Sequence, residues 1–134
     1  MDDQALTARL REILERSQQA YDKQHQNNER KKKWVKEQVW PAFEVLEHTL
    51  NGMRVEGVSK GWEEVNGWVT FKHDGKEFRY TIKVVVSPKG VTGTIQFRLP
   101  EYTSGPIENI VEWTQDAIIE NFLELLGTWH PEER

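Results

Sequence analysis

The sequence contains no cysteine among its 134 residues. Disulfide bonds, thiolate metal sites and a cysteine nucleophile are therefore excluded. It also lacks a run of about 18 apolar residues, the length that a membrane-spanning helix needs. The first residues, 1–5, are polar and acidic and do not resemble the apolar core of a signal peptide. We therefore predict a cytoplasmic protein that does not associate with membranes.

Motifs that would support catalysis are also scarce. No serine lies in a GxSxG motif, and the glycine-lysine pair at 75–76 lacks the glycine frame of a phosphate-binding loop. The four histidines are far apart, and no HExxH motif is present. We predict no catalytic residue, no metal site and no cofactor, and the sequence disfavours an enzyme.

Glycine and proline are almost missing from the first part of the chain. No glycine occurs before Gly52, Pro41 is the one proline before it, and helix-forming residues dominate. We expect helix over residues 3–50, kinked or restarted near Pro41 and ended by Asn51-Gly52. No large apolar residue occurs from Asp22 to Lys33. The sequence therefore allows either one long projecting helix or two helices that fold back near residues 24–28.

An apolar stripe marks the start of this helical region. Its members recur at helical spacing and are Leu6, Leu10, Ile13, Leu14 and Tyr21. If the helix is continuous, the stripe lies too far along the chain to fold under the rest of the protein. We expect it to be a self-association surface, most simply for a second copy of the chain.

Residues 68–99 indicate an antiparallel meander. Asp74-Gly75 is a strong two-residue hairpin signal, and Ser87-Pro88-Lys89-Gly90 predicts a second turn. The first turn pairs Phe71 with Phe78. The second pairs Val86 with Val91, because a register shifted by one residue would mix the apolar and polar faces. One face is then apolar throughout.

The opposite face of the meander is polar and mostly basic. Residues 66–98 carry 6 basic and 2 acidic side chains, whereas residues 99–134 carry 1 and 8, and the whole chain has a net charge of −4. The face is either an ordinary solvated surface or a surface for an anionic partner such as nucleic acid. Its candidate residues are Lys72, Arg79, Lys83 and Arg98.

Two segments flank the meander. Residues 53–60 predict a strand that Gly57 weakens, so we expect it at an edge or with a bulge. After the meander, Gly105-Pro106 predicts the start of a helix that continues to residue 126 and ends at Gly127. This helix carries acidic residues every four positions, which we interpret as a solvated face or as a docking site for a basic surface.

The combined prediction is an α+β fold. It has a long N-terminal helix kinked near Pro41, a three- to four-stranded antiparallel meander and a C-terminal helix, with the helices on one face of the sheet. Residues 1–134 form a single domain, in which 1–33 are a candidate projecting arm, 34–127 the body and 128–134 a tail. The predicted function is a small interaction or adaptor protein that forms a homodimer through its N-terminal helix. The alternatives are nucleic-acid or other anionic-partner binding through the basic sheet face, and a small-ligand carrier or enzyme with a pocket between sheet and helices.

Overall fold

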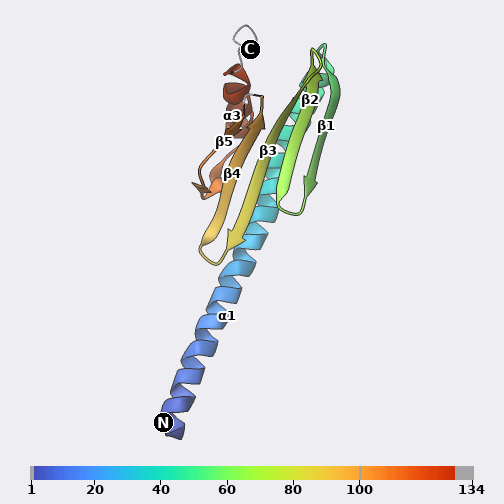
Figure 1. The fold of residues 1–134 in the computed structure, drawn as a ribbon. Helices are drawn as coiled ribbons and strands as arrows, with labels where there is room; N and C mark the ends of the chain where they lie inside the picture. The colour runs from blue at the N-terminus through green and yellow to red at the C-terminus, as the bar shows by residue number, and fades with distance from the viewer. Residues whose placement is uncertain (1, 100, 129–134) are drawn as a thin grey trace.

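The computed structural model describes residues 2–99 and 101–128. It confirms the predicted α+β fold: a long N-terminal helix and a shorter C-terminal helix pack on one face of an antiparallel sheet (Figure 1). Within the described residues, the helical segments are α1 (Asp3–Trp34), η1 (Val35–Val39), α2 (Trp40–Asn51), η2 (Ile110–Glu112) and α3 (Gln115–Gly127). The strands are β1 (Glu56–Glu63), β2 (Asn66–His73), β3 (Lys76–Ser87), β4 (Gly90–Arg98), β5 (Tyr102–Thr103) and β6 (Ile107–Glu108).

The helix from Asp3 to Asn51 runs without a turn back, so the two-helix alternative is excluded. Asn27, in the middle of the polar stretch, is buried against the β3–β4 turn, where its Nδ2 donates to the Ser87 carbonyl at 2.9 Å. Pro41 falls in the first turn of α2, as predicted. The preceding segment η1 has π-helical hydrogen bonding, with the Trp40 N–H donating to the Val35 carbonyl. The restart thus takes the form of a short π-helical segment inside one long helix.

The sheet has the predicted register. Phe71 pairs with Phe78 across β2 and β3, and Val86 pairs with Val91 across β3 and β4. The strand order is β1-β2-β3-β4-β5, and β6 also pairs with β4. The meander therefore has four long strands, to which β5 and β6 add two residues each.

The 53–60 segment forms the edge strand β1, with the expected bulge. Gly57 has φ 61°, and the pairing with β2 shifts between Glu56 and Ser59. The hairpin that follows turns at residues 64–65, where Glu64 has φ 51°. Asn66-Gly67, which resembles a turn in sequence, instead begins β2.

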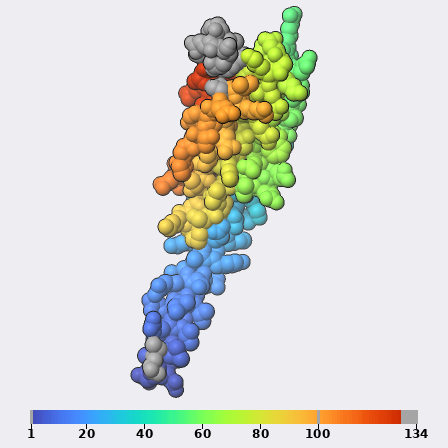
Figure 2. Space-filling model, viewed as in Figure 1, coloured from blue at the N-terminus to red at the C-terminus, as the bar shows by residue number. Residues whose placement is uncertain are grey.

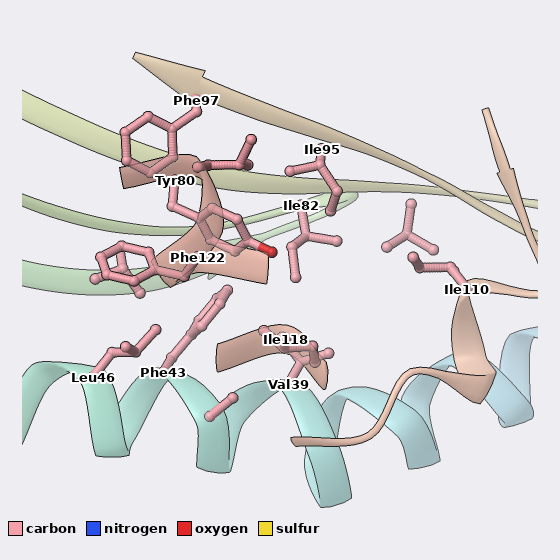
Figure 3. Packing of buried hydrophobic residues seen from close by; sticks show 14 of the residues in the cluster. Val39, Phe43, Leu46, Tyr80, Ile82, Ile95, Phe97, Ile110, Ile118 and Phe122 are labelled. Carbon is pink, nitrogen blue, oxygen red and sulfur yellow. The ribbon is translucent and has the colours of Figure 1, made fainter. Parts of the chain in front are cut away.

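One hydrophobic core lies between the helices and the inner face of the sheet (Figure 3). Phe43 and Leu46 of α2 face Tyr80 and Ile82 of β3, and Phe122 of α3 packs edge-on against Tyr80 with ring centroids 5.5 Å apart. Tyr80 is fully buried, and its hydroxyl donates to Asn121 Oδ1 at 2.7 Å. Burial raises the pKa of Tyr80 far above its ordinary value of 10.0.

The predicted start of the C-terminal helix at Pro106 is wrong. Ile107 pairs with Gly93 in the sheet, and Asn109 adopts φ 52°, which ends the extended segment. The helix begins at Gln115, because the Thr114 side chain caps it by accepting from the Ala117 N–H at 3.2 Å. The carboxylates of Glu108 and Glu112 therefore lie outside the regular helical series of acids.

Candidate interaction surfaces

The first part of α1 projects beyond the sheet as a free arm (Figures 1 and 2). We define the arm as residues 2–21, because the first hydrogen bond from α1 to the sheet comes from Gln24, whose Nε2 donates to the Val86 carbonyl at 3.2 Å. The predicted stripe is exposed along this arm: Leu6 is 47%, Leu10 51%, Ile13 52%, Leu14 68% and Tyr21 68% exposed. The structure thus places all five residues on one element, with no described residue covering them.

The stripe continues the face by which α1 packs on the body. Gln24, Asn27, Lys31 and Trp34 all contact the body, and Trp34 Nε1 donates to the Trp113 carbonyl at 2.7 Å. Ala20, Ile13 and Leu6 lie at successive steps of seven residues before Asn27. A helix drifts by only about 20° per seven residues, so the two faces are neighbours on the helix surface. Leu6 and Ile13 therefore face broadly the same side as the sheet, whereas Leu14 and Tyr21 are turned further round the helix.

A row of basic residues flanks the stripe. Arg9, Arg16, Lys23 and Arg30 recur every seven residues. Where the arm meets the body, Arg16 and Lys23 join Lys89 of the β3–β4 turn around a notch of about 630 Å³. We call this the basic notch; Ala20, Asn27 and Pro88 also line it. The sequence did not reveal it, because Lys89 reaches α1 only through the fold.

The outer face of the sheet carries the four predicted basic residues. Arg79 and Arg98 are directly opposite on β3 and β4, whereas Lys72 and Lys83 lie toward opposite ends of the face. Three of the four have compensating neighbours, whereas Lys83 lies opposite the neutral residues Asn66 and Thr94. Arg79 lies over the Trp68 ring at 5.3 Å, Arg98 Nη1 is 3.8 Å from Glu77 Oε1, and Lys72 pairs across the strands with Glu77 and Glu56.

A shallow hollow of about 430 Å³ on this outer face is mixed in charge. Glu63 and Glu64 line it together with Trp68 and Arg79. Acidic side chains therefore interrupt the basic surface, and it has no continuous cationic track of the kind that follows a nucleic-acid backbone.

An apolar pocket of about 440 Å³ opens between α2, α3 and the hairpin end of β2 and β3. Its lining includes Leu50, Met53, Phe71, Phe78 and Leu123. Three distant segments supply these residues, so sequence reasoning could name a pocket between sheet and helices as an alternative but could not locate it.

Metal binding, membrane spanning and ionisation can each be assessed for the described residues. No group of three or more metal-ligating side chains occurs within residues 2–99 and 101–128. Among the same residues, no helix has the length and apolar character needed to cross a bilayer. Burial raises the pKa of Tyr80, but this residue is part of the hydrophobic core.

The chain matches no protein-family model, and no curated protein or solved structure is significantly similar to it.

Proposed function

We propose that this protein is an interaction protein that self-associates by pairing its N-terminal arms. The observation that carries the proposal is the exposed stripe of Leu6, Leu10 and Ile13 on a helix that extends past its own sheet. An exposed apolar stripe of this length favours burial against another surface. The arm of a second copy of the chain supplies the missing apolar contacts, and a second copy is present wherever the protein is present.

The position of the body favours an antiparallel pair. The stripe and the sheet lie on the same side of α1, so two parallel arms would bring both β3–β4 turns into the space between the helices. Antiparallel arms avoid this collision, because each body then lies beyond the tip of the partner arm. In this arrangement Leu10 lies beside Ile13 of the partner, and Leu6 lies beside Ser17.

The charged residues of the arm also favour the antiparallel direction. Asp2 caps α1, with its Oδ1 accepting from the Ala5 N–H at 2.7 Å. In the antiparallel register Asp2 reaches Lys23 of the partner, so each acidic arm tip meets a basic notch. Arg9 of one arm lies within about 3 Å of Arg16 of the other along the axis, and the ion pair that Glu12 forms with Arg16 offsets the repulsion.

Sedimentation velocity over a concentration series tests the proposal. We expect the full-length chain to dimerise reversibly, because about five helical turns pair. Ile13→Glu places a charge in the centre of the stripe and should weaken dimerisation at least about tenfold. Ala8→Glu adds the same charge to the opposite side of the arm and is the matched control. A full-length chain that stays monomeric at the highest attainable concentration would disprove the proposal.

A further inference from the structure

The apolar pocket lies at the end of the body away from the arm, so it is independent of the proposed dimer. Its floor is the stacked pair Phe71 and Phe78, whose ring centroids are 4.9 Å apart. Leu50 and Leu123 form walls from α2 and α3, and Met53 stands at the edge. A volume of about 440 Å³ lies within the range of small-molecule sites, which are mostly apolar with a few polar groups.

Two exposed large apolar side chains line this pocket. Met53 is 58% exposed and Leu123 is 50% exposed, although both lie beside the buried core residues Leu50 and Phe78. Two large apolar side chains at the mouth of an apolar pocket indicate a surface whose burial against a ligand would be favourable.

The polar groups of the pocket are cationic or neutral. Arg54, His73 and Thr49 line it, and no carboxylate does so among the described residues. His73 has an acidic neighbour, with its Nε2 3.5 Å from Asp74 Oδ2. Arg54 forms no ion pair with any residue in 2–99 or 101–128. The pocket therefore combines an apolar interior with one uncompensated guanidinium.

We infer that this pocket binds a small amphipathic monocarboxylate, with its aliphatic tail over Phe71 and Phe78 and its carboxylate on Arg54. A guanidinium suits this head group, because its planar N–H groups can pair with both carboxylate oxygens. The tail needs no specific hydrogen bond, so apolar burial and a single charged contact account for recognition.

Isothermal titration calorimetry with decanoate below its micelle concentration, on the full-length protein, tests the inference. We expect saturable binding with one ligand per chain. In NMR spectra of labelled protein, the amide shifts should be centred on Leu50, Phe78 and Leu123. Thr49→Trp fills the mouth from the exposed side of α2 and should abolish binding without unfolding the protein, which circular dichroism checks.

The head-group contact has its own test. Arg54→Ala should weaken decanoate binding about tenfold, the effect of losing one charge-assisted pair, and should leave decanol binding unchanged. Arg98→Ala removes a cation from the outer sheet face and is the matched control. The inference is overturned by an absence of saturable binding, by binding that persists in Thr49→Trp, or by decanoate affinity that does not depend on Arg54. None of these results bears on dimerisation through the arm.

Discussion

Two tryptophans occupy the space above two glycines on opposite faces of the β1–β2 hairpin. Gly61 pairs with Trp68 and Gly67 pairs with Trp62. A Cβ at Gly61 would lie 2.4 Å from the Trp68 ring, and a Cβ at Gly67 would lie 2.3 Å from the Trp62 ring. Both rings therefore lie flat against the backbone, and glycine is required by space rather than by backbone conformation.

Gly67→Ala should destabilise the protein by about 1–3 kcal/mol, because its methyl group would collide with Trp62 and lie 3.0 Å from the buried Phe43 ring. Urea denaturation measures the effect. Gly127→Ala, at the end of α3 where nothing lies within 4 Å of an added Cβ, is the control and should be neutral or slightly stabilising. Equal stability of the two variants would contradict the packing argument.

Tyr80 should make the folded state sensitive to alkaline pH. Its pKa is raised by burial, so above about pH 10 the unfolded chain loses this proton while the folded chain keeps it. The free energy of unfolding should then fall by about 1.4 kcal/mol per pH unit for this group, whereas at neutral pH the group has no such effect.

The measurement is urea denaturation at several pH values between about 9 and 11. The difference in pH dependence between the wild-type chain and Tyr80→Phe isolates the effect of the Tyr80 hydroxyl from that of other groups that lose protons in the same pH range. Tyr102→Phe, at an exposed tyrosine, should keep the wild-type slope. A Tyr80→Phe slope equal to that of the wild type would show that the buried hydroxyl is not responsible.

The strand registers and the Trp–Gly contacts show what the sequence can and cannot predict about individual residues. The β2–β3 register followed from the Asp74-Gly75 turn, and the β3–β4 register followed from the apolar pattern, because a slip by one residue would have mixed the apolar and polar faces. The two Trp–Gly contacts did not follow, because they depend on a turn at residues 64–65, whereas in sequence Asn66-Gly67 resembles the turn.

At the level of elements, the polar part of α1 is a docking segment rather than a solvated spacer. Asn27 Nδ2 donates to the Ser87 carbonyl, and Lys31 Nζ donates to the Glu64 carbonyl at 3.3 Å. Side-chain amides and ammonium groups thus satisfy carbonyls at two turns of the sheet. Hydrophobic periodicity cannot detect such a contact, which is why the sequence left open whether this segment was a bridge or a loop.

Asn27→Ala should lower the free energy of unfolding by about 0.5–1.5 kcal/mol, because the half-buried Ser87 carbonyl would lose the hydrogen bond donated by the buried Asn27 side chain. Thermal unfolding gives the loss of stability, and hydrogen exchange should show faster opening of the β3–β4 turn. Gln18→Ala is the control: this exposed residue of the arm bonds only to Asp22, and the change should stay within about 0.5 kcal/mol. Unchanged protection of the turn in Asn27→Ala would argue against this role.

The C-terminal helix illustrates a different limit of prediction. Gly105-Pro106 is a good helix start in isolation, but β4 offers backbone partners at Thr92 and Gly93, which residues 107–108 take. The Thr114 cap then sets the start of α3. Local sequence favoured the first start, and tertiary pairing selected the second.

At the level of the whole molecule, arm and body should be separable at residue 20. Deleting residues 2–19 removes Leu6, Leu10, Ile13 and Leu14 of the stripe but keeps Gln24 and Asn27 on the β3–β4 turn. We expect a folded monomer whose urea midpoint matches that of the full-length chain at low concentration, since the deleted residues form hydrogen bonds and ion pairs only within α1 in the part of the chain that the structure describes. Sedimentation and circular dichroism measure both properties. A truncated chain that unfolds would mean that the arm supports the body.

The absence of cysteine allows the direction of pairing to be tested by cross-linking. In an antiparallel pair, the two copies of residue 17 lie about 16 Å apart along the axis, too far for a disulfide. Ser17→Cys alone should therefore resist oxidation to a covalent dimer, whereas Ser17→Cys mixed with Leu6→Cys should cross-link. Rapid cross-linking of Ser17→Cys by itself would indicate parallel arms and contradict the proposed direction.

The continuity of α1 with η1 and α2 has a kinetic consequence for association. Starting a helix is the unfavourable step, and the packed segment from Gln24 onward already supplies a formed turn on which the arm can grow. The arm can therefore stay helical in the monomer and present its stripe already shaped. Encounter between two chains then requires alignment rather than coupled folding, so assembly should be fast, and the lifetime of the dimer should set its affinity.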